Sequence, residues 1–211
     1  MTRHFNWDAV LFDMDGVLWD SMPIHQEAFA SVLRDFDYRP HMGKSTTEVV
    51  RAAMPGATAA RVREVVLAKQ GIARELLKKR NPIRPGAREL LAALKRNHLQ
   101  RLLVTGASVD SMTLFLEMND LASAFDGLVH EGMFARPKPA PDAYLTAADL
   151  LDLLPEQCLV VEDTVHGVRA GRLADCTVCG IVGTVAPSWL TKAGAVKVVA
   201  DLEELGEWIG L

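Results

Sequence analysis

Two aspartates, Asp13 and Asp15, directly follow the apolar run 7–12, and Gly16 comes after them. A carboxylate can attack phosphorus and form an acyl phosphate, which replaces one difficult displacement with two easier ones. A second carboxylic acid nearby can protonate the leaving oxygen and later accept a proton from water. Alone, such a pair is also typical of a turn. Asp13 is therefore predicted as a nucleophile and Asp15 as the general acid and base only if other reactive groups join them.

Other reactive side chains lie at the ends of later apolar runs. One run ends at Thr105 and is followed by Gly106, another ends at Glu162 and Asp163, and Lys138 lies in a proline-rich loop. Glu162 and Asp163 follow a buried run, which is a costly place for two unpaired charges. Ligands of a parallel α/β sheet bind beyond the carboxyl ends of its strands, so these groups are expected to converge. Lys138, the Thr105 hydroxyl and loop N–H groups could then bind a phosphate.

The charge of this group predicts a cofactor. The four carboxylates and Lys138 carry a net charge of −3, and a phosphate dianion would bring the total to −5. So much like charge in one cleft requires a divalent cation. Because the available ligands are all oxygens, Mg2+ is favoured over zinc.

Short apolar runs alternate with amphipathic helical stretches over most of the chain. The predicted strands are at 7–12, 101–105, 125–129, 158–162, 177–182 and 196–199. The predicted helices between them include 86–97, 108–118, 141–151 and 164–174. This alternation predicts an α/β fold, with a doubly wound, Rossmann-like parallel sheet covered on both faces.

The stretch 20–82 breaks the alternation, because it holds helical patterns at 23–36, 46–54 and 58–80 and no convincing strand. Residues 1–19 and 83–211 are therefore predicted to form the α/β core, and 20–82 an inserted helical cap. Trp19 lies next to this junction and could line a substrate entrance or simply pack there.

Here the chain resembles the haloacid dehalogenase superfamily. The segment FDMDGVLWDS fits that family's first motif, D-x-D-G-x-[LV], and Thr105 fits the second. Lys138 in PKPAPD fits the third motif and VVEDTVHGVRAG fits the fourth. Pro137 stands where the family often has glycine, which could stiffen the loop without removing the lysine charge. The four motifs occur in order and span nearly the whole chain.

The resemblance implies roles for these residues. Asp13 would be the nucleophile and Asp15 the general acid and base. Mg2+ would be held by Asp13, the backbone carbonyl of Asp15 and Asp163, with Glu162 assisting. The insert at 20–82 would be the small helical cap type, which opens and closes over the site.

The resemblance also separates branches of the family. Dehalogenases and phosphonatases lack an aspartate at the place of Asp15, which leaves phosphatases and phosphomutases. The segment DSMPIH, which ends at His25, is similar to one in sugar-phosphate phosphatases and in β-phosphoglucomutase, where the histidine touches the acid or the substrate. A substrate or acid contact is therefore favoured for His25 over a histidine that faces solvent at a helix start. Lys44, in GKSTTE from Gly43 to Glu48, could recognise an anionic substrate or be a solvated cap lysine.

Three departures distinguish this chain from the mutase. Thr46 replaces a mutase arginine that grips the distal phosphate, and Ser108 and Val109 replace a lysine and an asparagine. The first hypothesis is therefore a Mg2+-dependent phosphatase for a small phosphorylated metabolite, such as a sugar phosphate or phosphoglycolate. The alternatives are a β-phosphoglucomutase-like mutase and, less favoured, a non-catalytic phosphate-binding protein.

Composition sets the remaining bounds. The 211 residues are 49% hydrophobic and 24% charged, with a net charge of −4, which does not indicate a nucleic-acid partner. The odd count of three cysteines favours a reducing compartment, and Cys176 and Cys179 lack a second ligand pair for zinc. No signal-peptide or membrane-spanning stretch is evident, so a cytoplasmic location is expected. The oligomeric state is not predicted.

Overall fold

The chain is described by a computed structural model that covers residues 7–34, 36–41 and 44–211. It divides into two compact units, one running to Asp20 and resuming at Ile83–Leu211, the other Ser21–Pro82. The sequence analysis placed these junctions after residues 19 and 82. Gly43 of the GKSTTE segment lies outside the described residues.

The larger unit is built on one parallel sheet of six strands. The strands are β1 (Ala9–Phe12), β2 (Gln100–Val104), β3 (Gly127–Val129), β4 (Cys158–Glu162), β5 (Thr177–Ile181) and β6 (Lys197–Val199). Their spatial order is β3-β2-β1-β4-β5-β6, and every neighbouring pair is parallel. The chain winds outward from β1 in both directions, so β1 and β4 flank the point where the winding reverses. Ligands of such sheets bind at that point, beyond the carboxyl ends of the strands.

The register fixes which residues emerge together at that edge. Phe12 is paired with Leu103 on one side and with Val161 on the other. The next residue of each strand brings Asp13 level with Glu162, and the Asp13 N–H donates to the Val161 carbonyl at 3.1 Å. A shift of one residue would turn these side chains to the other face of the sheet. The buried apolar pairing of the strands therefore positions the acidic groups.

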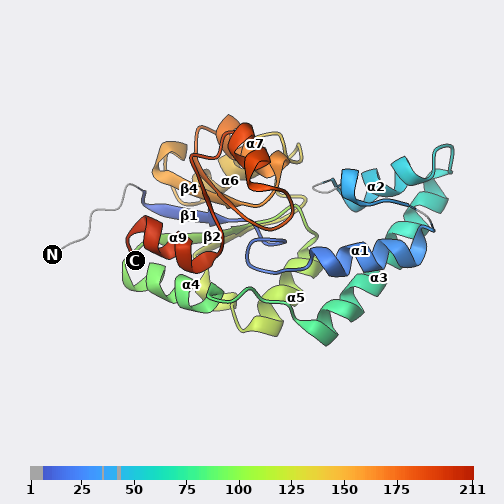
Figure 1. Cartoon of the computed structure of the whole chain (residues 1–211), viewed down its shortest axis with the longest axis horizontal. Helices are drawn as coiled ribbons and strands as arrows, with labels where there is room; N and C mark the ends of the chain where they lie inside the picture. Colours follow the sequence, from blue (N-terminus) through green and yellow to red (C-terminus); the bar gives the residue numbers. More distant parts are fainter. Residues whose placement is uncertain (1–6, 35, 42–43) are drawn as a thin grey trace. The chain divides into compact units, whose positions relative to one another are not determined.

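The helices among the described residues of this unit lie around the sheet. They are α4 (Ala87–Arg96), α5 (Val109–Asn119), α6 (Asp142–Leu150), α7 (Val165–Leu173), α8 (Pro187–Ala193) and α9 (Leu202–Ile209). In Figure 1, α6 and α7 lie on one face of the sheet, and α4 and α9 lie on the other. The doubly wound fold was predicted. Helices α8 and α9 were not predicted individually, because each is only two turns long.

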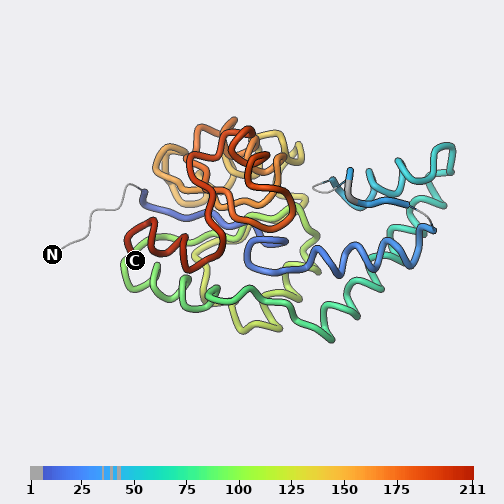
Figure 2. Tube along the Cα trace, viewed as in Figure 1, coloured from blue at the N-terminus to red at the C-terminus, as the bar shows by residue number. Residues whose placement is uncertain are grey.

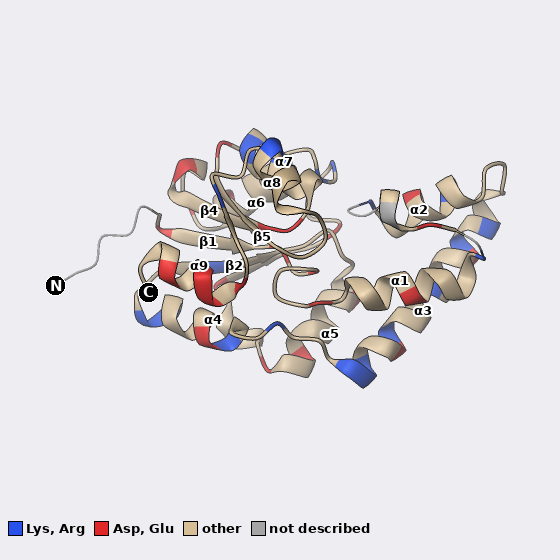
Figure 3. Ribbon diagram, viewed as in Figure 1, with Lys and Arg blue, Asp and Glu red and all other residues tan. Residues whose placement is uncertain are grey.

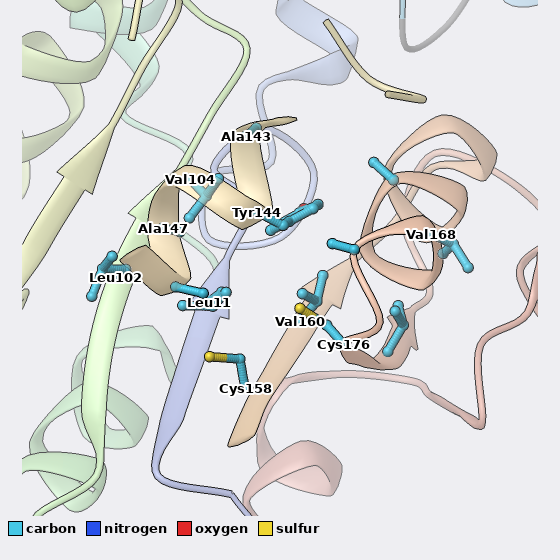
Figure 4. Close-up of a cluster of buried hydrophobic side chains, with 14 of the residues drawn as sticks. Leu11, Leu102, Val104, Ala143, Tyr144, Ala147, Cys158, Val160, Val168 and Cys176 are labelled. Carbon is cyan, nitrogen blue, oxygen red and sulfur yellow. The ribbon is translucent and has the colours of Figure 1, made fainter. Parts of the chain in front are cut away.

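The core on the α6 and α7 face shows the strand period of two. Leu11, Leu102 and Val160 alternate with residues of the other face and pack against Tyr144 of α6 and Val168 of α7 (Figure 4). All four residues of β1 and all five of β4 are buried, as expected for strands covered on both faces.

The three cysteines are free thiols packed in this interior. Burial raises the pKa of Cys158 to about 11 and the pKa values of Cys176 and Cys179 to about 12. At neutral pH all three are therefore protonated thiols and act as small apolar side chains.

The smaller unit holds α1 (Met22–Val32), α2 (Thr46–Ala53) and α3 (Ala59–Arg80). Helices α1 and α3 run side by side, as Figure 2 shows. The predicted helix at 23–36 was too long: α1 ends at Val32, and Leu33 is already extended. Beyond the helix end, Tyr38 stacks on Phe29 of α1, with ring centroids 4.6 Å apart.

The surface charges of the helices are mixed in sign. Both signs occur on the helices (Figure 3), but Lys and Arg outnumber Glu along α3 and α4. In the described ranges of the chain, no helix is both long enough and apolar enough to cross a bilayer.

Candidate active site

Lys138 joins the ends of two central strands. Its ammonium donates to Asp13 Oδ1 at 2.6 Å and to Glu162 Oε1 at 2.7 Å, and it lies 3.3 Å from the Val104 carbonyl. Asp13 follows β1, Glu162 ends β4, and Lys138 belongs to the loop before α6. The side chains of all three are largely buried. The convergence expected from the sequence is therefore present for these residues.

Tyr144, on α6, contacts both members of the Lys138–Glu162 ion pair. Its hydroxyl donates to Glu162 Oε1 at 2.7 Å, and its ring centre lies 4.8 Å from the Lys138 ammonium. Sequence reasoning placed this residue on a helix but missed its contact with the site. The only available signal was the polar hydroxyl of a buried aromatic residue, which normally requires a partner.

The second oxygen of Glu162 is also occupied by protein groups. Oε2 accepts from the N–H groups of Asp163 at 3.2 Å and Thr164 at 3.4 Å, and from the Thr164 hydroxyl at 3.1 Å. Thr164 Oγ1 in turn accepts from the Gly167 N–H at 3.0 Å and caps α7. A Cβ at Gly167 would lie 1.8 Å from the Glu162 carboxyl group. Glu162 is thus enclosed by donors, and its geometry suits positioning Lys138.

Asp163 differs from its neighbour. It is fully buried, and its Oδ2 accepts from the Thr184 N–H at 3.0 Å and from the Thr184 hydroxyl. Oδ1 is buried and, among the described residues, has no hydrogen-bond partner. A buried carboxylate oxygen without a partner is unfavourable unless a cation binds it.

Gly16 makes room for Asp163. Its φ is +82°, and a Cβ at this position would lie 1.9 Å from Asp163 Oδ2. A side chain is therefore excluded twice, by the backbone conformation and by the carboxylate. Gly16 thus makes room for the Asp163 carboxylate and also permits a tight turn.

The pKa values reflect an excess of negative charge. Burial raises the pKa of Asp13 well above its ordinary range, opposed by Lys138 and reinforced by Glu162 and Asp163. Burial, together with Glu162, raises the pKa of Asp163 to about 7, against hydrogen bonds from Thr184 that lower it. Burial would lower the pKa of Lys138, but Asp13 and Glu162 outweigh it and raise that pKa. Lys138 is therefore a permanent cation.

These residues fit a divalent metal ion. One carboxylate oxygen from each of Asp13, Glu162 and Asp163 lies within 4.8 Å of the others. With Lys138, the ionised group carries a net charge of −2, which one divalent cation balances. Asp163 Oδ1, for which the described part of the chain provides no hydrogen-bond partner, is an oxygen of the type that hard cations prefer.

Asp15 lies three residues after the end of β1. It is half-buried and forms a backbone bridge with Trp19, in the turn that Gly16 shapes. Its predicted role as acid and base stays a prediction. Trp19 itself is fully buried and packs on Phe115 at 5.3 Å, which agrees with the packing interpretation rather than the substrate entrance.

Thr105 and Gly106 follow β2 on the other side of β1. Thr105 is buried, and its Oγ1 accepts from the Ala107 N–H at 3.0 Å, which leaves the hydroxyl proton available for donation. Gly106 is exposed, and a Cβ there would meet nothing within 4 Å. Ser108 caps α5 by accepting from the Ser111 N–H at 3.4 Å.

The cap residues are described within their own unit. His25 Nδ1 lies 2.9 Å from the ammonium of Lys69, which is only 4% exposed and lies over the Phe29 ring. Lys69 was missed by the sequence analysis because a lysine in a charged helix reads as a surface residue. The ammonium of the exposed Lys44 lies 3.5 Å from His41 Nδ1.

The segment after Lys44 begins a helix. Ser45 caps α2 and forms a capping box with Glu48, in which the Glu48 carboxylate accepts from the Ser45 N–H at 2.9 Å. Helix capping therefore accounts for part of the GKSTTE pattern.

The family model "haloacid dehalogenase-like hydrolase" matches residues 7–175. The chain is 32% identical over 179 residues to hexitol phosphatase B of Escherichia coli, covering 79% of each protein. It is 29% identical to a phosphorylated carbohydrates phosphatase of Thermotoga maritima, covering 94% of this chain and 96% of that protein. A solved β-phosphoglucomutase of Clostridium difficile has the same fold, with a TM-score of 0.84, 24% identity, and coverage of 96% of this chain and 95% of that one.

One relative is much longer. The chain is 29% identical to SUPPRESSOR OF QUENCHING 1, chloroplastic, of Arabidopsis thaliana, and the match covers 92% of this chain but only 20% of that protein. The cytoplasmic location expected from the sequence stays a prediction.

Proposed function

The chain belongs to the haloacid dehalogenase-like hydrolase family, and within it we propose a Mg2+-dependent phosphatase that hydrolyses a small phosphomonoester through an aspartyl-phosphate on Asp13. One observation carries this proposal. Lys138 is held between Asp13 and Glu162, and one carboxylate oxygen from each of Asp13, Glu162 and Asp163 lies within 4.8 Å of the others. That arrangement provides a nucleophile, a fixed cation and a place for a second cation at one strand edge.

The metal would be held by Asp13 and Asp163, together with the backbone carbonyl of Asp15 that the family resemblance implies. When bound, Mg2+ would balance the carboxylates and draw charge from the phosphate oxygens. Glu162 was also predicted as a ligand. Because both of its oxygens already accept hydrogen bonds, we assign it to Lys138 instead.

The chain's own residues account for both chemical steps. Lys138 fixes the Asp13 carboxylate and lies beside the incoming phosphate oxygens, while the Thr105 hydroxyl and the open backbone at Gly106 bind others. Asp13 attacks phosphorus as Asp15 protonates the leaving oxygen, which releases the alcohol. Asp15 then accepts a proton from water, whose oxygen attacks the phosphoaspartate and releases inorganic phosphate and Asp13.

The substrate class is supported by the names of the relatives, which include phosphatases of hexitols, phosphorylated carbohydrates and fructose 1-phosphate. We therefore propose a phosphorylated sugar or sugar alcohol as the substrate. The cap residues His25 and Lys44 remain candidates for substrate contacts. The mutase alternative is disfavoured at Ser108, whose hydroxyl is engaged in capping α5.

A phosphate-release assay across a panel of sugar and sugar-alcohol phosphates tests the proposal. We expect release that depends on Mg2+, is abolished in Asp13→Asn, and is retained in the exposed control Asp152→Asn. Absence of release, or release that survives Asp13→Asn, would contradict the proposal. Conversion to an isomeric sugar phosphate without phosphate release would favour the mutase.

A further inference from the structure

The two oxygens of Asp163 have different surroundings. Oδ2 accepts two hydrogen bonds from Thr184, one from its N–H at 3.0 Å and one from its hydroxyl. Oδ1 is buried, and within the described residues no donor reaches it. Thr184 lies in the loop between β5 and α8, 21 residues from Asp163 in sequence.

The Oδ2 side is also closed by backbone. A Cβ placed at Gly16 would lie 1.9 Å from Oδ2, and one at Gly183 would lie 2.9 Å from it. Oδ2 therefore lies where a side chain at either glycine would collide with it.

The loop that carries Thr184 is itself fixed. The Val182 carbonyl accepts from the Arg84 guanidinium at 2.7 Å, and the Val182 N–H donates to the Val199 carbonyl at 2.9 Å. Thr184 thus approaches Asp163 from a loop anchored two residues earlier.

Carboxylate denticity differs between hard cations. Ca2+ takes six to eight oxygen ligands and readily binds both oxygens of one carboxylate, whereas Mg2+ requires near-octahedral geometry at shorter distances. A carboxylate with one oxygen committed to the protein can offer only the other. Such a ligand fits Mg2+ and deprives Ca2+ of a bidentate contact.

We infer that Thr184 is a positioning residue that makes Asp163 a one-oxygen ligand, and so sets the preference of the site for Mg2+ over Ca2+. The inference rests on the metal site of the proposed function. It goes further, because Thr184 lies outside the four motifs.

The test measures metal affinity without turnover. Denaturation midpoints of wild type, Thr184→Val, Thr184→Ser and Thr191→Val are recorded in EDTA and across Mg2+ and Ca2+ titrations, which yields an apparent Kd for each metal. Thr184→Val keeps the N–H donor and the shape but loses the hydroxyl. Thr191→Val is the matched control, because its hydroxyl bonds only its own helix, at the Pro187 carbonyl. The EDTA midpoint shows whether each variant is folded.

Loss of a group that orients a metal ligand typically weakens binding ten- to a hundredfold. We therefore expect Thr184→Val to raise the Mg2+ Kd by about tenfold or more. The Ca2+ Kd should rise less, because Ca2+ can compensate by binding Oδ2 as well, so the ratio of the Ca2+ Kd to the Mg2+ Kd falls. Thr184→Ser and Thr191→Val should keep the wild-type ratio. A folded Thr184→Val with the wild-type ratio would overturn the inference and leave the proposed function standing. A wild type stabilised by neither metal would overturn the metal site itself.

Discussion

Asp163→Asn is expected to stabilise the metal-free protein while abolishing its response to Mg2+. Burial raises the pKa of Asp163 from 3.8 to about 7, so the folded protein holds this proton more tightly than the unfolded chain does. Well below pH 3.8 the side chain is neutral in both the folded and the unfolded state and does not lower the stability of the folded protein. As the pH rises to about 7 the cost grows, and above pH 7 it is fully present.

The magnitude follows from the shift. Roughly three pKa units at about 1.4 kcal/mol each give a cost of about 4 kcal/mol for the metal-free protein at pH 8. Asparagine fits the same space and carries no charge, so this cost disappears. The variant has no anionic oxygen at the position of Oδ1, so Mg2+ loses its buried ligand.

Urea denaturation at pH 4 and pH 8, with EDTA or with saturating Mg2+, measures both effects. In EDTA at pH 8 the variant should exceed wild type by up to about 4 kcal/mol, and at pH 4 the difference should nearly vanish. Mg2+ should stabilise wild type, more at pH 8 than at pH 4, and leave the variant unchanged. Asp152→Asn, at an exposed position with φ 54° that asparagine also adopts, is the control. A variant less stable than wild type in EDTA at pH 8 would refute the reasoning.

Three further substitutions test other parts of the structure. Gly16→Ala should abolish the Mg2+-induced rise in melting temperature, because its Cβ would displace the Asp163 carboxylate; an unchanged rise would contradict the contact. Tyr144→Phe should lower kcat about tenfold with little change in KM, because it removes one hydrogen bond to the charged Glu162. A Tyr144→Phe variant with the wild-type kcat would show that this hydrogen bond does not contribute to turnover. Ser45→Ala should cost about 1 kcal/mol in urea denaturation by removing the cap of α2, and equal stability would argue against it.

The sheet and its reactive edge were predictable because buried parallel strands read as continuous apolar runs. The runs ending before Asp13 and at Glu162 fixed the central strands closely, since a charged residue cannot continue a buried strand without a partner. The extent of α1 was not predicted: the helical pattern continued to residue 36, whereas the helix ends at Val32 and Leu33 is extended.

The residues outside the motifs that bond the site carboxylates were not predicted from the sequence. Tyr144 and Thr184 each bond a carboxylate that is 18 or 21 residues distant in sequence. Tyr144 reads as part of an apolar helix face, and Thr184 lies in a loop with no periodicity. Their contacts depend on the winding of the sheet around β1, which brings α6 and the loop after β5 to the same edge.

Glu162 and Asp163 show that the number of carboxylates at a site does not determine which of them can bind a metal ion. In sequence they are two adjacent acids at a strand end, and both were predicted as metal ligands. In the structure Glu162 is still in β4, and its oxygens accept from Lys138, Tyr144, Thr164 and the Asp163 N–H. Asp163 follows the strand, and one of its oxygens is buried with no donor among the described residues. The number of hydrogen bonds at each oxygen, rather than the number of carboxylates, therefore separates the side chain suited to hold the lysine from the one suited to hold a metal ion.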